Sequence, residues 1–266
     1  MNQQNLKNIS EALITVTPSA ARPRLRELIK MARRQYLRTN AVARYRGNRV
    51  ECPVCQWHGR EFLPNGLKQR TNAICPRCGA LERHRLLYLY LKDRTDVFVT
   101  QMRLLHFAPE PALSRILAAS PNIDYITTDL YDPTVMVRTD ITDMLFKDNF
   151  FDFILCSHVL EHIPDDRRAV QELRRVLRAG GTAIVQVPLQ ESPEAPTLED
   201  PAVTTPEERQ RVFGQRDHVR IYGYDVANRL MDAGFEVNVV TYARELGEAA
   251  TTRYGLVEND PIFHLT

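Results

Sequence analysis

The sequence predicts an α/β protein in which a doubly wound, mostly parallel sheet of seven strands follows a small unit held together by metal. Two observations lead to this prediction. From about residue 102, short apolar runs alternate with amphipathic helical segments over about 160 residues, a pattern typical of such sheets. Before this stretch, the motif Cys-Pro-x-Cys occurs twice, at Cys52/Cys55 and at Cys75/Cys78.

The four cysteines have the spacing C-x2-C-x19-C-x2-C, which is typical of two tight turns that hold one tetrahedral zinc ion. All four ligand positions are filled by sulfur, so no position is left for water or substrate. We therefore predict a structural Zn²⁺ site and interpret residues 48–80 as a zinc ribbon, a unit stabilised by metal more than by a hydrophobic core.

Charge is distributed unevenly along the chain. Residues 1–100 contain 19 Lys and Arg against 7 Asp and Glu, whereas residues 101–266 contain 16 against 26. The basic residues are densest in 22–49, and from Pro23 an apolar stripe at helical spacing predicts a basic amphipathic helix. We interpret residues 1–47 as a basic helical arm, which either contacts phosphates, anionic lipid or an acidic partner, or packs against its own protein.

The spacing of apolar residues, and the glycines and prolines between the apolar runs, predict the helices and strands that follow the ribbon. A helix follows Gly79, with Leu86, Leu87, Tyr90 and Leu91 on its buried side. Later helices are expected at 110–119, 165–178 and 223–233. The expected strands are 102–107, 123–128, 134–138, 152–157, 182–188, 235–242 and a stretch within 256–265.

These elements assign residues 81–266 to the larger domain. The domain contains a polar, proline-rich and acidic insertion at 189–215, which is a candidate lid. The chain has 266 residues, no run of 18 apolar residues and no secretory signal, so we expect no transmembrane span. Five cysteines, four of them assigned to zinc, favour a cytoplasmic location, and the sequence leaves the oligomeric state open.

Polar residues collect where the predicted strands end. Open α/β sheets bind ligands beyond the carboxyl ends of their strands. Asp129 ends the second strand, where a carboxylate can hold ribose hydroxyls, and Asp140 and Ile141 follow the third, where they can hold an adenine. Ser157 and His158 follow the fourth strand, and residues 214–223 lead into a helix that could cover the pocket.

The segment from Phe151 to Ile163 contains His158-Val-Leu-Glu161-His162 and is similar to the fourth-strand motif of class I S-adenosylmethionine-dependent methyltransferases. The resemblance covers about residues 102–242, including Leu173 to Gly181 and Asp217 to Tyr222. It implies a Rossmann-like methyltransferase fold and S-adenosyl-L-methionine as the cofactor.

One stretch departs from the family pattern of an acid followed by a glycine-rich loop. Here His106 occupies the acid position, and Ala108, Glu110 and Ala112 replace the glycines. Glu110 either pairs with the ammonium group of the cofactor or closes the pocket and leaves a non-catalytic scaffold.

The sequence favours a methyltransferase that acts on a small molecule or a glycan hydroxyl, with His158 and His218 as candidate bases. The cofactor-binding candidates are His106, Ala108, Glu110, Asp129, Asp140, Ile141 and Ser157. One alternative is an RNA methyltransferase that grips RNA through the zinc ribbon and basic arm. The other is a binding protein that has lost catalysis.

Overall fold

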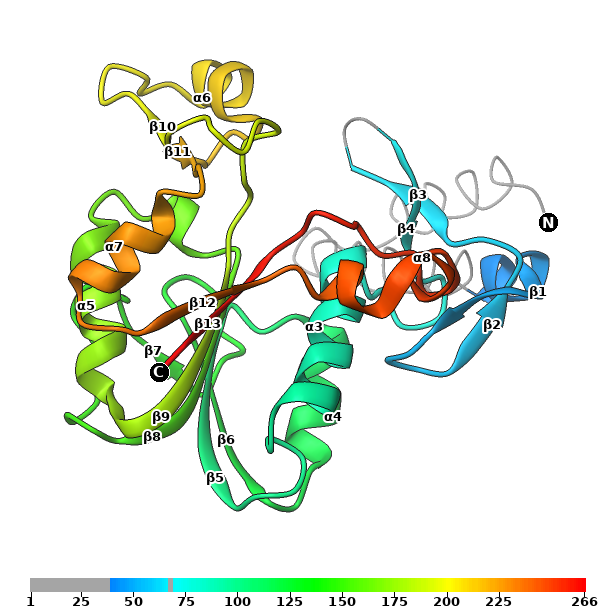
Figure 1. Cartoon of the computed structure of the whole chain (residues 1–266), viewed down its shortest axis with the longest axis horizontal. Helices are drawn as coiled ribbons and strands as arrows, with labels where there is room; N and C mark the ends of the chain where they lie inside the picture. Colours follow the sequence, from blue (N-terminus) through cyan, green and yellow to red (C-terminus); the bar gives the residue numbers. More distant parts are fainter. Residues whose placement is uncertain (1–38, 67–68) are drawn as a thin grey trace, which may run out of the picture. The chain divides into compact units, whose positions relative to one another are not determined.

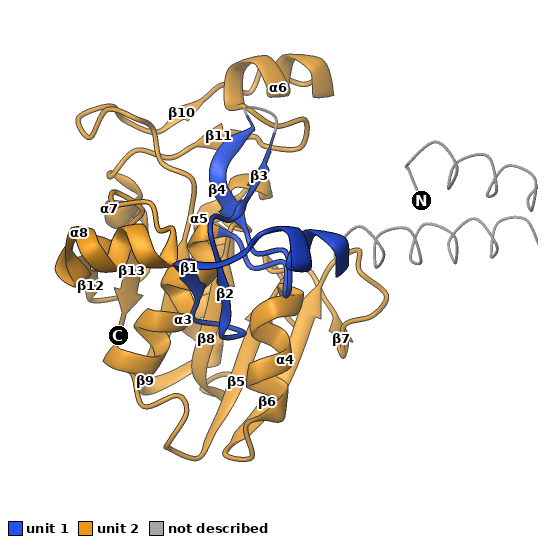
Figure 2. Ribbon diagram, turned by 90° about the vertical axis from the view of Figure 1, so that its right-hand side faces the viewer, with its two compact units in different colours: residues 1–81 blue, residues 82–266 orange. Residues whose placement is uncertain are grey.

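The computed structural model describes residues 39–66 and 69–266 (Figure 1). It divides into two compact units, residues 1–81 and 82–266 (Figure 2), each of which is described by itself. The basic helix expected from Pro23 lies outside the described residues. The division into an arm, a ribbon and a larger domain stays a prediction.

In the described part of the first unit, helical residues 39–44 are followed by two antiparallel hairpins. Strand β1 (Arg46–Cys52) pairs with β2 (Trp57–Gly59), and β3 (Leu63–Asn65) pairs with β4 (Arg70–Ile74). A Cβ added at Gly59 would lie 2.0 Å from the Trp57 ring, so only glycine lets the indole cover β2. The Trp57 and Phe62 rings lie 5.9 Å apart in a small buried cluster.

Seven strands form the central sheet of the second unit in the order β12-β13-β9-β8-β5-β6-β7. Strands β5 to β9 run parallel, and β13 runs antiparallel to both β9 and β12. This confirms the predicted doubly wound, mostly parallel sheet. The strands are β5 (Met102–Phe107), β6 (Ile123–Asp129), β7 (Val137–Arg138), β8 (Phe151–Ser157), β9 (Leu177–Gln186), β12 (Val237–Val240) and β13 (Ile262–Leu265).

The direction of winding reverses between β5 and β8. From β5 the chain continues outward to β6 and β7, then returns to place β8 on the other side of β5. In open α/β sheets, ligands bind in the crevice that such a reversal creates at the carboxyl ends of the strands. The four strands β5, β6, β7 and β8 therefore define the sheet edge where a site is expected.

Helices cover both faces of this sheet (Figure 1). Helices α3 (Glu82–Arg94), α4 (Pro111–Ala119) and α8 (Tyr242–Tyr254) share one buried apolar cluster with the sheet, and α5 (Asp166–Val176) and α7 (Val226–Asp232) share another. Neighbouring residues on β5 alternate between the clusters, as the two-residue period of a strand requires. Within the described ranges, no helix has the length and hydrophobicity to cross a lipid bilayer.

The structure differs from the sequence expectation in four respects. The third strand, β7, is only two residues long. Strand β9 begins at Leu177, within the range expected for a helix, because Leu177 pairs with Phe151 of β8. Helix α8 was not expected, since Gly247 interrupts its pattern. The insertion contains β10 (Leu198–Glu199), α6 (Pro206–Phe213) and, just after it, β11 (Arg220–Ile221).

Candidate functional site

The four cysteines of the first unit lie around one point. Their sulfur atoms are all within 4.8 Å of one another. The Sγ atoms of Cys52 and Cys78 are 3.6 Å apart, and those of Cys55 and Cys75 are 3.7 Å apart. Four thiolates bound to one zinc at about 2.3 Å have sulfur atoms about 3.8 Å apart. The spacing therefore fits tetrahedral coordination and is far too long for a disulfide.

Each cysteine pair sits in a tight turn. The Gln56 N–H donates to the Cys52 carbonyl over 2.8 Å, and the Gly79 N–H donates to the Cys75 carbonyl over 2.9 Å. The Ala80 N–H also lies 3.4 Å from Cys78 Sγ, where it can donate to a thiolate. Three of the four cysteines, Cys52, Cys75 and Cys78, are buried.

The second group of residues lies where β5 leaves the sheet. His106 is fully buried, and its Nδ1 is 2.9 Å from the Tyr125 hydroxyl. Ala108 has φ of 44°, a left-handed conformation that favours glycine, and its N–H donates to the Thr128 carbonyl over 2.9 Å. The backbone thus makes a sharp turn into α4 without the glycines of the family pattern.

Glu110 places a largely buried charge at the end of this turn. Its side chain is 12% exposed, and Oε2 lies 2.9 Å from His106 Nε2. Burial alone would raise the pKa of the Glu110 carboxyl, but the hydrogen bond and charge of His106 lower that pKa to about 2. Oε1 lies 3.5 Å from His84 Nε2 and has no hydrogen-bond partner among the described residues. The Glu110 carboxylate near the end of β5 is therefore ionised, and its Oε1 atom can accept a further hydrogen bond.

Sequence reasoning missed His84 at this position. Its side chain is 7% exposed, and it comes from α3, which was expected to contribute only packing residues. Burial lowers the pKa of His84 to about 4, although the Glu110 carboxylate opposes this shift. The only sequence signal was a histidine placed within an otherwise apolar helix face.

The two predicted acids lie at the ends of the next strands. Asp129 Oδ1 accepts hydrogen bonds from the N–H groups of Tyr131 and Asp132, over 2.6 and 2.8 Å. Asp140 Oδ1 accepts from both the N–H and the hydroxyl of Thr142, over 2.8 and 2.7 Å. Both carboxylates therefore have fixed orientations, and Asp140 is exposed.

Ile141 and Ser157 are both buried. Ile141 is 4% exposed and belongs to the apolar cluster that includes Leu105 and Phe107, so it packs beneath the sheet edge. Ser157 Oγ donates to Gln186 Oε1 on the neighbouring strand over 3.3 Å. Their predicted contacts with a cofactor stay predictions.

The exit of β8 brings together the predicted bases His158 and His218 and two further residues, Glu161 and His162. His158 has φ of 55°, and its Nδ1 lies 3.1 Å from Glu161 Oε1. The His162 and His218 rings meet edge to face at 4.8 Å. Burial lowers the pKa of His218, which favours its neutral form. The motif His-x-x-Glu-His, read with the later Asp-His, was the signal that could have revealed this cluster.

Arg220 is held by contacts within the protein. It is 4% exposed, donates to the carbonyls of Leu160, Ile163 and Pro164, and pairs with Glu199 over 2.9 Å. These contacts tie the insertion to the segment after β8. Arg220 therefore has a structural role.

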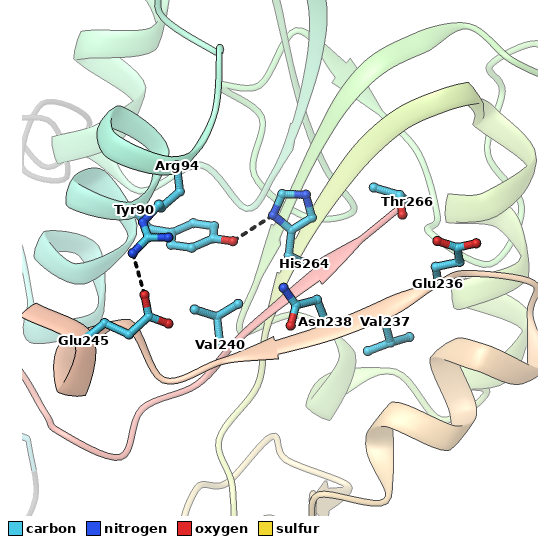
Figure 3. Close-up of a pocket in the computed structure, with 9 residues that line it drawn as sticks. All are labelled: Tyr90, Arg94, Glu236, Val237, Asn238, Val240, Glu245, His264 and Thr266. Atoms are coloured by element: carbon cyan, nitrogen blue, oxygen red, sulfur yellow. Dashed lines mark hydrogen bonds and ion pairs between the residues drawn. The ribbon is translucent and has the colours of Figure 1, made fainter.

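A cavity of about 500 Å³ lies elsewhere in the second unit, beside β12 and β13 (Figure 3). There the Tyr90 hydroxyl meets His264 Nδ1 at 2.8 Å, and Arg94 pairs with Glu245 over 2.6 Å. None of its lining residues belongs to β5, β6 or β8. The cavity is thus separate from the polar groups at the carboxyl edge.

Comparison with known proteins gives one family match. Residues 117–185 match the family model described as "Methyltransferase domain". This segment has 69 of the 266 residues and runs from the end of α4 into β9. An uncharacterized protein of Methanocaldococcus jannaschii is 43% identical over 51 residues, which are 19% of this chain and 22% of that protein.

Similar solved structures include a complex between the Haloferax volcanii Trm112 methyltransferase activator and a protein described as a methyltransferase. The matched chain has 16% identity and a TM-score of 0.49, over 69% of this chain and 90% of that one. An S-adenosylmethionine-dependent methyltransferase from Mesorhizobium loti has 14% identity and a TM-score of 0.44, over 63% of this chain and 90% of that one. The chain thus contains a segment that matches a methyltransferase domain, within a sheet of the Rossmann-like methyltransferase topology.

The buried His84 predicts a pH dependence of stability. The pKa of His84 falls from 6.5 to about 4 on folding. Between pH 4 and pH 6.5, the unfolded chain therefore binds a proton at His84 that the folded chain does not. The free energy of unfolding should therefore decrease by about 3 kcal/mol as the pH falls from 6.5 to 4. The variant His84→Asn should lose less stability over this range, as measured by urea denaturation at a series of pH values.

The exposed His58 provides the matched control, because His58→Asn should leave the slope of the pH profile unchanged. Equal slopes for the wild type and His84→Asn would show that burial of this imidazole does not govern the acid response.

Proposed function

We propose that residues 82–266 bind S-adenosyl-L-methionine at the carboxyl ends of β5, β6 and β8 and transfer its methyl group to an acceptor. The observation that carries this proposal is the buried Glu110 carboxylate, which keeps one oxygen without a hydrogen-bond partner among the described residues. Burying such a group is costly unless a donor or cation meets it. The methyltransferase-domain match and the strand order support the same proposal.

The residues at this edge fit the chemical groups of the cofactor. The Glu110 carboxylate suits the ammonium group, because opposite charges attract strongly where water is scarce. Both hydrogen bonds to Asp129 end on Oδ1, so Oδ2 can accept from ribose hydroxyls. Ala108 keeps the backbone close to the site with only a methyl side chain. Asp140 and Ile141 stay our candidates for the adenine.

The bound cofactor supplies an electrophilic methyl group, and the chain must place an acceptor in line with it. A hydroxyl acceptor also needs a base to take its proton. His158 and His218 are the proposed bases, since the lowered pKa keeps the buried His218 neutral and Glu161 orients the His158 ring. Two imidazoles at this position favour a hydroxyl of a small molecule or glycan as the acceptor.

An RNA acceptor is the second candidate, and the charge distribution favours it. Residues 1–100 have a surplus of 12 positive charges, obtained as 19 Lys and Arg minus 7 Asp and Glu. Such a segment can grip a phosphate backbone. Residues 22–38, which hold seven of the ten Lys and Arg in 22–49, lie outside the described residues.

We also propose that Cys52, Cys55, Cys75 and Cys78 hold a structural Zn²⁺. The sulfur spacing and the donated N–H groups fit a zinc thiolate site. The hairpins around the site bury few large side chains, so metal would supply much of their stability. Thiolates persist in a reducing compartment, so this proposal keeps the cytoplasmic location predicted from the sequence.

Replacing Asp129 by Ala should weaken binding of S-adenosyl-L-methionine by about 1–3 kcal/mol, because the ribose hydroxyls lose their acceptor. Isothermal titration calorimetry of the full chain measures this change directly. The matched control is Asp124→Ala, which removes an exposed carboxylate at the other end of the same strand.

The control should bind as the wild type does. If the wild type releases no heat even at high cofactor concentration, the protein is a non-catalytic scaffold and the proposed function is wrong. An unchanged dissociation constant in Asp129→Ala would place the ribose elsewhere.

Replacing Cys75 by Ala should remove the zinc from the first unit and destabilise its hairpins, because three thiolates bind the ion less well than four. Elemental analysis and amide hydrogen exchange over residues 46–74 measure both effects. The matched control is Cys156→Ala, since Cys156 lies buried in β8, outside the cluster.

The Cys156→Ala protein should retain its zinc. A Cys75→Ala protein with undiminished zinc content would contradict the four-thiolate site.

The two acceptor classes differ in their response to salt. An RNA methyltransferase that uses the arginines of 22–49 should lose affinity for single-stranded RNA with a log–log slope of about −0.7 per neutralised phosphate. Fluorescence anisotropy at increasing salt measures the slope. A flat or absent response, with cofactor binding intact, would exclude RNA and favour a small hydroxyl acceptor.

A further inference from the structure

A second group of potential metal ligands lies at the exit of β8, away from the four cysteines. One ligand atom each from Glu161, His162 and His218 falls within 4.8 Å of the others. Glu161 and His162 belong to a short 3-10 helix, Leu160–His162, directly after β8, whereas His218 comes from the segment before β11. The Val219 N–H donates to the Glu161 carbonyl over 2.9 Å and fixes the two segments side by side.

Two buried atoms in this cluster lack hydrogen-bond partners among the described residues. Glu161 is fully buried, its Oε1 contacts His158 Nδ1, and its Oε2 contacts no donor. His218 is 3% exposed, and its Nδ1 likewise has no partner. An unpartnered carboxylate oxygen and an unpartnered imidazole nitrogen are each costly to bury. A cation between them would offset both costs at once.

A carboxylate also flanks the outer histidine. Asp217 Oδ2 lies 3.3 Å from His162 Nδ1, and carboxylates in this position commonly orient metal-binding imidazoles. The His162 and His218 rings stand nearly perpendicular, at 87°. Nitrogen and oxygen ligands of one tetrahedral zinc ion lie about 3.4 Å apart, so side-chain rotations would bring these atoms, now within 4.8 Å of one another, onto one ion.

We propose that Glu161, His162 and His218 bind a divalent transition-metal ion, of which Zn²⁺ fits the donors best. Two imidazole nitrogens and one carboxylate oxygen are a typical donor set for Zn²⁺ and related first-row ions, whereas Ca²⁺ and Mg²⁺ prefer oxygen alone. Three protein ligands leave at least one position open for water or another oxygen ligand. His218 would then be a metal ligand, and His158 would be the remaining candidate base at this edge of the sheet.

The test compares the zinc content of the full chain with that of two variants, Glu161→Gln and His218→Ala, after dialysis against dilute Zn²⁺. The wild type should retain one zinc ion per chain more than either variant, because each variant loses a ligand. His264→Gln is the matched control, since this half-buried histidine bonds to Tyr90, far from the cluster. It should match the wild type.

A second readout identifies the ligands. A mild chelator that leaves zinc on the four cysteines should empty this site in the wild type. Co²⁺ added afterwards should give visible absorption without a thiolate charge-transfer band, and both variants should lack it. Circular dichroism checks that each variant is folded. If His218→Ala does not fold, the metal comparison rests on the isosteric Glu161→Gln. Equal metal content in wild type and variants would overturn the proposal, as would cobalt binding with thiolate character only. Cofactor calorimetry on the same samples tests the proposed function independently.

Discussion

The hydrogen bond between His106 and Glu110 holds a buried negative charge at the point where β5 leaves the sheet. His106 lies in the sheet core with no exposure to solvent, so its position is set by the strands on both sides. It lowers the pKa of Glu110 and fixes one carboxylate oxygen, while the other oxygen lies 3.5 Å from His84 Nε2 and has no hydrogen-bond partner among the described residues. A cation-binding position can thus exist without the glycine-rich loop of the family pattern.

The reversal of winding between β5 and β8 explains why separate polar groups gather at one edge. Glu110 follows β5, Asp129 ends β6 and the histidines follow β8, so three strands supply the three groups of polar residues at this edge. The proposed cofactor would lie against the first two groups. The proposed metal ion would lie at the third, beside the candidate base His158. The insertion is anchored to this region through Arg220 and Glu199.

The sequence predicted the sheet well because buried parallel strands form continuous apolar runs, as in Phe151–Ser157. The cysteine cluster was predictable because ligand spacing is local in sequence. His84 was not, because it reaches Glu110 only through the packing of α3 against the sheet. The approach of Glu161 to His218 also depends on a long-range contact, because the Val219 N–H donates to the Glu161 carbonyl. Ile141 belongs to the apolar cluster beneath the sheet edge, and its contact with an adenine stays a prediction.

Binding of the cofactor at the ends of β5 and β6 is tested most directly by a crystal structure of the protein with S-adenosylhomocysteine, which keeps the ammonium and ribose groups of the cofactor. The ammonium nitrogen should lie about 3 Å from Glu110 Oε1, as in a charge-assisted hydrogen bond. The ribose hydroxyls should contact Asp129. A nucleoside bound away from the ends of β5 and β6, or a Glu110 side chain that fills this position, would contradict it.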